Sequence, residues 1–502
     1  MLRGTLSSGR WRRAGRVRRW PIARWRVLAL VGVHLLIAAH LLHYAFAGET
    51  VGRVVLADAR ETVERGIVNP AFVLFALALL ATALFGRFFC GWACHMGALQ
   101  DASAWLLRRV GIRPRPFRSR LLGYAPLLLA LYLFVWPSVL RQFVHPLLAS
   151  AWPAAAAGLQ PIAPFPGWSA AWTSRDLWAG LPGPCVAVPF LLVCGGATVY
   201  FLGARGLCRY ACPYGGLLRP AARIAPLRVV VDPDLCDGCA RCTAACSIGV
   251  RVHEQTRDYG SVVDPDCMRT LDCIEACPTQ ALRLRPQAPV RVAVAPASGV
   301  GWRGELGLAA VALVGTLALR GLYDRIPLLL AAALGVLLAF LVARGMELRR
   351  PRAVTLAPFL LRDAGGLRRA GRIYLALLGA LLLLVAQSAL VQGALWRGRG
   401  LDAAVHAGWE QVAAGAVDPA QQALARSALS WYRLASPPAA GGLALATTPE
   451  VPLRRAWLHL VVGEAAIAER TLREHLAAAP DDAPARAALA ELLMRQGRAT
   501  SP

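Results

Sequence analysis

The chain has 502 residues, of which 57% are hydrophobic, and its mean hydropathy is +0.47. These values are far from those of a soluble enzyme of this length, so they indicate a membrane protein. The formal net charge is +26, and arginine supplies all 55 basic residues because the sequence contains no lysine. The arginines gather beside apolar segments, where anionic lipid and membrane topology account for them, and no basic domain carries a recognition motif. Nucleic acid is therefore excluded as a partner.

Seven segments are long and apolar enough to cross a bilayer, since a spanning helix needs roughly 20 mostly apolar residues. They are 27–47, 70–89, 121–140, 184–204, 306–323, 326–343 and 373–396. The fifth and sixth are short and adjacent, which predicts a tight helical hairpin.

The distribution of arginine between the loops predicts how the chain is oriented. Nine arginines and no acid precede the first span, three arginines face four acids in 48–68, seven fall in 90–120 with Arg87, two in 141–183 and eight in 344–372. The positive-inside rule then places the N-terminus in the cytoplasm. The arginine-rich start is not interpreted as a cleavable signal, because the first apolar core is too long and no small-residue cleavage site follows.

Three histidines, His34, His40 and His43, lie within the first predicted span, where ionisable side chains are functional candidates. His145, after the third span, falls at a depth similar to that of His40 and His43. These residues could form a quinol site, or a haem pocket with His43 and His145 as axial ligands. The alternative is that neighbouring helices or interfacial water satisfy them.

A cysteine motif occurs twice, after the second and the fourth predicted spans. Residues 87–99 align without gaps on residues 205–217, so that Arg, Cys, an aromatic residue, Ala, Cys, Gly and Leu recur at an offset of 118. The four cysteines are Cys90, Cys94, Cys208 and Cys212. If either motif continued its helix, its two cysteines would share one face, at i and i+4. Two such pairs meeting at a pseudo-symmetric interface would supply four thiolates, enough for one 4Fe–4S cluster.

Residues beside these cysteines have two interpretations each. The arginine three residues before each pair either offsets the negative charge of a thiolate-bound cluster or anchors the helix by snorkelling. His95 is either a cluster ligand or a polar residue at the membrane surface. Cys185 and Cys194 lie in the fourth span without a partner at cluster spacing, and we assign both to packing. Disulfides are not expected, because eleven of the 13 cysteines fall on the reducing cytoplasmic side.

Next comes a ferredoxin-like stretch with the spacing Cys-x2-Cys-x2-Cys-x3-Cys, at Cys236, Cys239, Cys242 and Cys246. This spacing is typical of two-cluster bacterial ferredoxins, in which three thiolates hold one cluster and the fourth serves its neighbour. Zinc also takes four cysteines, but usually as two Cys-x2-Cys pairs with a longer spacer. The stretch therefore predicts iron–sulfur clusters and electron transfer.

A second cysteine group, Cys267, Cys273 and Cys277, follows the same template except that Thr270 replaces one cysteine. With the usual crossing, Cys277 completes a 4Fe–4S cluster with Cys236, Cys239 and Cys242. Cys246, Cys267 and Cys273 then offer only three thiolates. This second site could hold a 3Fe–4S cluster, recruit another ligand to a 4Fe–4S cluster, or be degenerate.

Beyond residue 396 the sequence is polar enough to be soluble, rich in alanine and helical. Ala456, Gly463, Ala468, Leu472 and Pro480 fall at the offsets of a tetratricopeptide repeat, and 490 and 497 continue the period of 34. A generic helical hairpin is the alternative. Because isolated repeats are rarely stable, we expect this segment to pack on helices within 402–436 or on a partner.

The two membrane-edge motifs, Phe-Cys-Gly-Trp-Ala-Cys and Cys-Arg-Tyr-Ala-Cys-Pro, together with the ferredoxin-like pair, resemble membrane polyferredoxins of the NapH/NosR type and the related cytochrome-oxidase-assembly ferredoxin. The resemblance covers roughly residues 27–285. It implies electron transfer at the membrane, with quinol oxidation or support of a periplasmic reductase in some members and copper handling in the assembly relative. The chain departs from the pattern at His95, Ser247 and Thr270, where the family has proline, proline and cysteine.

Together these features predict a mainly α, polytopic membrane protein with about seven spans, an inserted α+β ferredoxin-like domain and a C-terminal repeat-like domain. The expected domains are 1–26, a basic cytoplasmic tail; 27–220, a four-span unit; 221–300, the ferredoxin-like domain; 301–397, three further spans; and 398–502, a soluble helical domain. In a bacterial inner membrane the clusters would face the cytoplasm and the C-terminal domain the periplasm.

The predicted function is electron relay between the quinone pool and a partner redox protein of a respiratory system, as an electron-transfer subunit of the quinol dehydrogenase type. Inner-membrane lipid, quinone, and a periplasmic reductase or cytochrome docked on the C-terminal domain are the expected partners. The alternative is an assembly or regulatory factor that senses redox state or reduces a metal during maturation of a client metalloenzyme. No Gly-x-Gly-x-x-Gly fingerprint accompanies a strand–helix pattern, which disfavours direct use of a nicotinamide or flavin cofactor.

Overall fold

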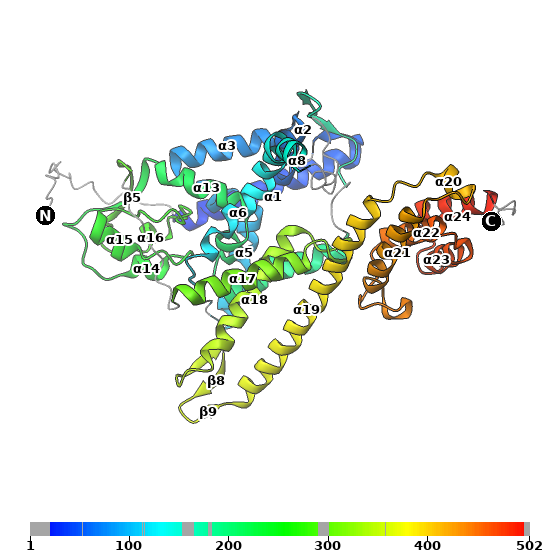
Figure 1. Cartoon of the computed structure of the whole chain (residues 1–502). Coiled ribbons are helices and arrows are strands. Elements are labelled where there is room, and N and C mark those ends of the chain that lie inside the picture. The colour runs from blue at the N-terminus through cyan, green and yellow to red at the C-terminus, as the bar shows by residue number, and fades with distance from the viewer. Residues whose placement is uncertain are drawn as a thin grey trace.

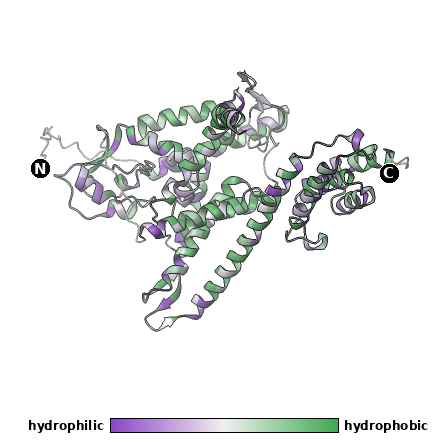
Figure 2. Ribbon diagram, viewed as in Figure 1, coloured by the Kyte–Doolittle hydropathy of each residue, from purple (hydrophilic) through white to green (hydrophobic). Residues whose placement is uncertain are grey.

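A computed structural model describes residues 21–52, 54–112, 114, 116–152, 165–178, 183–289, 301–356 and 358–495. Most of the basic tail predicted at 1–26 lies outside these residues. The chain is mainly helical and polytopic, as predicted, and its ferredoxin-like segment and C-terminal helices lie at opposite ends of the molecule (Figure 1). Hydrophobic residues are concentrated along the long helices between these ends (Figure 2).

Within the described residues, six helices are long and apolar enough to cross a membrane. They are α1 (Ile22–Ala47), the composite helix Leu122–Ala151, the composite helix Pro184–Leu202, α17 (Trp302–Leu319), α18 (Leu328–Glu347) and α19 (Arg369–Ala403). The second predicted span forms a shorter apolar helix, α3 (Pro70–Phe85), of 16 residues. It ends early because Gly86, at a φ of 78°, breaks the helix before the cysteine motif.

The two composite helices are irregular. The first runs through η2 (Leu122–Tyr124), α6 (Ala125–Ala130), η3 (Leu131–Val135), α7 (Trp136–Val139), η4 (Leu140–Val144) and α8 (His145–Ala151), and η3 and η4 are π-helical. The second runs through α10 (Pro184–Leu191), the π-helical η5 (Leu192–Ala197) and α11 (Thr198–Leu202). Prolines such as Pro137 and Pro189 lack the N–H group of a regular helix, so the hydrogen-bond pattern changes around them.

The loops after the first and third spans meet at one end of the membrane unit. β1 (Thr50–Val51) pairs antiparallel with β4 (Thr173–Ser174), and β2 (Ile67–Val68) pairs parallel with β3 (Ser169–Ala170). Between β1 and β2 lie η1 (Leu56–Asp58) and α2 (Ala59–Arg65). Both loops therefore lie on the same side of the helices. They are the two loops of the four-span unit with the fewest arginines, 48–68 and 141–183.

At the other end of the four-span unit lies the ferredoxin-like segment. Its strands β5 (Leu227–Val231) and β6 (Leu282–Pro286) pair antiparallel, with Val229 opposite Leu284. Between them lie three short helices, α14 (Arg241–Ala245), α15 (Val252–Tyr259) and α16 (Asp272–Glu275). The inner residues of this segment continue into one hydrophobic core that also contains Cys90 and Cys208 of the membrane unit.

The last three spans form a second group of helices. α17 and α18 make the predicted hairpin, joined by the short turn η6 (Leu322–Asp324), and Gly315 and Gly335 allow their close approach. After α18, a three-stranded antiparallel sheet of β7 (Val354–Leu356), β8 (Phe359–Asp363) and β9 (Gly366–Leu367) turns the chain back into α19.

The C-terminal segment is a stack of helices packed on the end of α19. It comprises α20 (Trp409–Ala413), α21 (Pro419–Leu434), η7 (Pro438–Ala440), α22 (Glu450–Val461), α23 (Ala465–Ala478) and α24 (Ala483–Arg495). α21 contacts both α19 and α22, so the segment is supported from within the chain. Ala456, Ala468 and Leu472 are buried in the contact of α22, α23 and α24, but assignment as a tetratricopeptide repeat stays a prediction.

Candidate iron–sulfur sites

Each cysteine motif follows a break at the end of a membrane helix. Gly86 and Gly203 have φ angles of 78° and 93°, which a residue with a side chain rarely adopts, and they end α3 and α11. Short helices then follow, α4 (Phe88–Trp92) with Cys90 and α12 (Gly206–Tyr210) with Cys208.

The second cysteine of each pair lies outside these short helices. Cys94 and Cys212 have extended backbones and stand immediately before α5 (His95–Arg109) and α13 (Pro213–Ile224). The hypothesis of an i, i+4 pair on one helical face is therefore wrong, because the chain leaves the helix between the two cysteines. Each pair instead joins the inside of one helix to the start of another.

The four cysteines of the two motifs are close enough for their charges to interact. Burial, with the neighbouring Cys208 and Cys90 thiols adding to the effect, raises the pKa of Cys94 to about 12. Burial also raises the pKa of Cys212, with Cys208, Cys94 and Cys90 adding to the effect. The raised pKa values of Cys94 and Cys212 mean that a metal centre would have to deprotonate these thiols on binding. Together with Cys90 and Cys208 they form a set of four soft ligands.

Backbone N–H groups at helix N-termini and nearby arginines lower the pKa of these thiols and so favour the thiolate form. The backbone N–H of Gly97 donates to the Cys94 thiol, and that of Gly215 donates to Cys212, which favours the thiolate at each helix N-terminus. For Cys208, burial raises the pKa while the charges of Arg205 and Arg87 lower it. The donor set and its surroundings therefore fit a negatively charged thiolate cluster.

Arg205, which precedes the second pair, reaches across to the first repeat. Its Nη1 donates to the backbone oxygen of Cys90 at 2.7 Å, while Nε and Nη2 lie 3.0 and 2.6 Å from the two oxygens of Asp101. Only 1% of Arg205 is exposed. A snorkelling anchor would extend toward water, so this interpretation is wrong for Arg205.

Arg87, which precedes the first pair, is equally buried and approaches Gly215 of the second repeat. Burial opposes its charge, but the Cys90 and Cys208 thiols and the Asp266 carboxylate outweigh burial and raise the pKa of Arg87. Snorkelling is wrong for this residue as well. The two arginines thus cross between the repeats, each placed beside the glycine that follows the opposite cysteine pair.

The ferredoxin-like segment contains the second thiol group. Cys236, Cys239, Cys242 and Cys277 line one cavity. This grouping follows the crossed pattern of two-cluster ferredoxins, in which the last cysteine of the second group joins the first three. His253 also lines this cavity and was not a candidate from the sequence.

The third group is Cys246, Cys267 and Cys273. Burial and the neighbouring Cys267 raise the pKa of Cys246 to about 11, and burial, Cys267 and Cys246 raise that of Cys273. Thr270, at the position of the missing cysteine, is buried with 5% exposed. Among the described residues, no group of three or more His, Cys, Asp or Glu side chains is arranged to hold a single metal ion.

The ferredoxin-like segment packs directly on the first cysteine motif. A Cβ at Gly91 would lie 2.3 Å from the backbone oxygen of Met268, so glycine is required for this contact. The indole Nε1 of Trp92 donates to the backbone oxygen of Arg269 at 2.8 Å. Cys90, Cys208 and Cys273 share one hydrophobic core, and Cys242, Cys246, Cys267 and Cys277 pack against it. One packed core therefore connects all three thiol groups.

Charged residues that the sequence did not single out strengthen this contact. Arg26 of α1 donates from Nε to the backbone oxygen of Gly91 at 3.0 Å and pairs with Asp101 and Asp272. Asp266 of the ferredoxin-like segment pairs with arginines of the membrane unit. The repeat contained a signal for Asp101. The equivalent residue 118 positions later is Arg219, so the two repeats carry opposite charges at this position.

The histidines are placed as follows. His40 and His43 both approach Thr50, with Nδ1 of each 3.2 and 3.3 Å from its hydroxyl oxygen, and His34 contacts the backbone oxygen of Leu30 on its own helix. His145 begins α8. No described hydrogen bond or ion pair joins His145 to the other three. A quinol site or haem pocket at these histidines stays a prediction.

One histidine and two further cysteines lie outside the three thiol groups. His95 starts α5, and burial and the neighbouring His34 lower its pKa. Cys194 is fully buried, and its backbone oxygen accepts from Gln100 Nε2 at 2.9 Å, whereas Cys185 is exposed. All thirteen cysteines are free.

Comparison with known sequences identifies these regions independently. A 4Fe–4S binding domain matches twice, at residues 70–113 and 186–229, and a 4Fe–4S dicluster domain matches residues 228–278. The ferredoxin-type protein NapH of Haemophilus influenzae is 27% identical over 218 residues, which cover 42% of this chain and 65% of NapH. The methylamine utilization ferredoxin-type protein MauN of Methylorubrum extorquens is 26% identical over 300 residues, covering 56% of this chain and 91% of MauN.

YccM of Escherichia coli is 23% identical over 212 residues, covering 41% of this chain and 53% of YccM. The chain thus spans less than two thirds of the length of NapH and of YccM. No solved structure matches.

Fold, cysteine motifs and matched domains together define a multi-pass membrane protein of the ferredoxin type, with 4Fe–4S binding domains. Within this class the chain resembles membrane polyferredoxins of the NapH type. The resemblance to NapH-type membrane polyferredoxins that the sequence motifs indicated is confirmed.

Proposed function

We propose that this protein carries electrons across the contact between its membrane unit and its ferredoxin-like segment. The observation that carries the proposal is the convergence of three thiol groups on one packed core. A ferredoxin-like segment that was only tethered to the membrane helices by the chain would not need the buried contacts at Gly91 and Trp92. Iron–sulfur clusters take up and release single electrons, so adjacent cluster sites in one core support electron relay.

Three sets of ligands follow from the placement of the cysteines. Cys236, Cys239, Cys242 and Cys277 would hold a 4Fe–4S cluster, and Cys246, Cys267 and Cys273 a second cluster with three thiolates. Cys90, Cys94, Cys208 and Cys212 would hold a third cluster between the two repeats. Arg87 and Arg205 would balance the charge of this third site, since both are buried beside its thiols.

The positive-inside distribution of arginine supports an inner-membrane location with these sites on the cytoplasmic side. The C-terminal helices, at the opposite end of the molecule, would then lie in the periplasm (Figure 1). In this arrangement the quinone pool is the proposed electron donor or acceptor within the membrane. A redox partner would dock on the C-terminal helices.

The first test is the metal content of the three sites. Protein purified anaerobically in detergent should contain iron and acid-labile sulfide, and Cys239→Ser and Cys208→Ser should each remove a different spectroscopic signal. Cys185→Ser is the matched control, because Cys185 is exposed in α10 and outside all three groups. Zinc in place of iron, or a loss of signal in the control variant alone, would contradict the ligand assignment.

The second test separates electron relay from assembly of a client metalloenzyme. The protein is reconstituted in lipid and mixed with a menaquinol or ubiquinol analogue under anaerobic conditions. Reduction of the clusters supports the respiratory role. No reduction, combined with binding of a client metalloenzyme to the C-terminal helices, favours the assembly role.

A further inference from the structure

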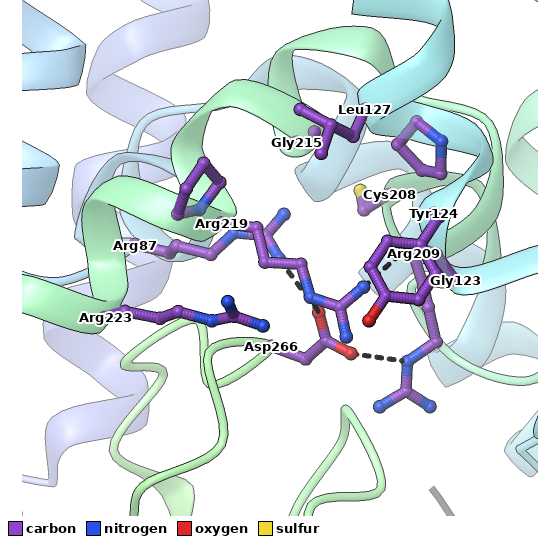
Figure 3. A pocket seen from close by; sticks show the side chains of 13 residues that line it. Arg87, Gly123, Tyr124, Leu127, Cys208, Arg209, Gly215, Arg219, Arg223 and Asp266 are labelled. Atoms are coloured by element: carbon purple, nitrogen blue, oxygen red, sulfur yellow. Dashed lines mark hydrogen bonds and ion pairs between the residues drawn. The ribbon is translucent and has the colours of Figure 1, made fainter. Parts of the chain in front are cut away.

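A cavity beside the second cysteine motif is lined by four arginines and one carboxylate. The charged residues are Arg87, Arg209, Arg219, Arg223 and Asp266 (Figure 3). Arg87 is buried, and Arg209 and Arg219 are largely enclosed, so their charges need acidic partners, because an unpaired buried charge is costly. This cavity therefore has an excess of positive charge.

The internal repeat explains the excess. In the first repeat, α5 carries Asp101, which pairs with Arg205 of the second repeat. The residue 118 positions after Asp101 is Arg219, so the corresponding place beside Arg87 holds a cation instead of a carboxylate. Likewise Arg209 stands at the position of Gly91. The second repeat thus gained two arginines where the first has an acid and a glycine.

Asp266 of the ferredoxin-like segment compensates for only part of this charge. Its carboxylate lies 3.5 Å from Arg87 Nη1, 3.2 Å from Arg209 Nε and 3.1 Å from Arg219 Nε. Asp264 is also near Arg209 and Arg219, but burial and the charge of Asp266 raise its pKa, which weakens its contribution.

Several donors around the cavity are not used. Arg87 is 1% exposed, and its Nε and Nη2 have no hydrogen-bond partner among the described residues. Arg223, at the exposed edge of the cavity, forms no ion pair with any described residue. In Figure 3 its guanidinium points toward the same space as those of Arg87 and Arg219. Unpaired guanidinium donors that converge in this way are suited to an oxyanion.

The position of the cavity indicates where the oxyanion comes from. Gly123, Tyr124 and Leu127 line it, and they belong to the first turns of the membrane helix Leu122–Ala151. Tyr124 and Ile224 are 54% and 63% exposed, which is typical of residues at a membrane interface. The cavity therefore opens at the end of this helix, where the headgroups of a surrounding bilayer would lie.

We propose that this arginine cavity binds a phosphate group, supplied by the headgroup of an anionic phospholipid. Arg87, Arg219 and Arg223 would donate to the phosphate oxygens, while Asp266 keeps Arg209 in place. A basic pocket between membrane helices at a headgroup surface has the chemistry for such recognition. The bound phosphate would neutralise the charge that the second repeat leaves unmatched.

The test uses full-length protein, purified in detergent and stripped of lipid, with native mass spectrometry as the readout. Phosphatidylglycerol should bind about tenfold more tightly than phosphatidylcholine of the same acyl chains, as expected for a charge-assisted contact. Arg223→Gln and Arg219→Gln should each remove about this tenfold preference. Arg350→Gln, which changes an exposed arginine just after α18, should leave it intact.

A second measurement separates a lipid from a free anion. Inorganic phosphate is added to the wild type and to Arg223→Gln, and thermal unfolding is followed. If phosphate stabilises only the wild type and phosphatidylglycerol is not preferred, the site stands and its ligand is a free oxyanion. The iron content of each variant reports folding, and Arg223 is exposed enough for its substitution to be tolerated. If neither lipid preference nor phosphate stabilisation depends on Arg219 or Arg223, the proposal is overturned.

Discussion

Arg205 of the second repeat donates a hydrogen bond to the backbone oxygen of Cys90 in the first, at 2.7 Å. The same guanidinium pairs with Asp101 in α5, the helix that follows Cys94. One buried side chain therefore fixes the position of the first cysteine pair relative to the second. This contact holds together two cysteine motifs that lie far apart in the sequence.

Removal of the Asp101 charge should destabilise this contact. In Asp101→Asn, Arg205 remains buried without its carboxylate, and we expect the free energy of unfolding to fall by about 3 kcal/mol. Chemical denaturation of detergent-purified protein, followed by the loss of cluster absorption, measures the change. Glu49→Gln is the matched control, since the Glu49–Arg175 pair is exposed and should contribute less than about 1 kcal/mol. Equal effects of the two substitutions would count against a structural role for the crossing arginine.

The glycines beside the cysteine pairs should not accept a methyl group. A Cβ at Gly97 would lie 2.9 Å from the Cys90 backbone oxygen and in close contact with Arg205, and a Cβ at Gly215 would lie 2.8 Å from the Cys208 oxygen. We expect Gly97→Ala and Gly215→Ala each to cost about 1–3 kcal/mol and to lower cluster occupancy. The ratio of iron to protein and the denaturation midpoint check this result. Gly307→Ala is the control, because no atom lies within 4 Å of its added Cβ.

Restoring the missing cysteine should change the second ferredoxin site. Thr270 and cysteine have similar volumes, and the side chain is buried next to Gly91. In Thr270→Cys we expect a three-iron signal in electron paramagnetic resonance to give way to a four-iron signal, with about one more iron per protein. Thr270→Ser, which adds no thiol, should leave the spectrum as in the wild type. An unchanged spectrum in Thr270→Cys would show that Cys246, Cys267 and Cys273 do not share a cluster.

The attachment of the C-terminal helices should depend on one buried carboxylate. Asp402, at the end of α19, accepts from Tyr432 Oη at 3.0 Å and from Arg454 Nε and Nη2 at 2.6 Å each, and only 4% of it is exposed. In Asp402→Asn we expect hydrogen exchange in α21 and α22 to accelerate about a hundredfold, as for a loss of about 3 kcal/mol. Exchange in α17 and α18 should stay unchanged. Glu450→Gln, which removes the exposed pair with Arg399, is the control.

Much of the architecture could be predicted from the sequence because membrane spans have a strong signal. Six of the seven predicted segments form helices of spanning length, and the 118-residue offset located both cysteine motifs. The second segment differs because hydropathy cannot detect the turn at Gly86, whose positive φ depends on the local backbone. The same limit applies to the helical face assumed for Cys90 and Cys94, since composition does not reveal where a helix stops.

The sequence identified the cysteines more readily than it identified the residues that contact them. Spacing identifies Cys236 to Cys246 because cluster geometry constrains neighbours in the chain. The contacts of Arg26 with Gly91 and of Asp266 with Arg87 join residues more than 60 positions apart, and no local pattern encodes them. Burial of Arg87 and Arg205 also contradicts the usual behaviour of membrane-edge arginines, and only tertiary packing shows it.

The length of α19 affects where the C-terminal helices lie. Its 35 residues form an unbroken rod of about 52 Å, whereas the hydrocarbon layer is about 30 Å thick. No proline interrupts the rod, and its far end is clamped by Tyr432 and Arg454. The C-terminal helices are therefore attached to a rigid helix that is longer than the hydrocarbon layer is thick, so their distance from the other membrane helices is fixed by α19.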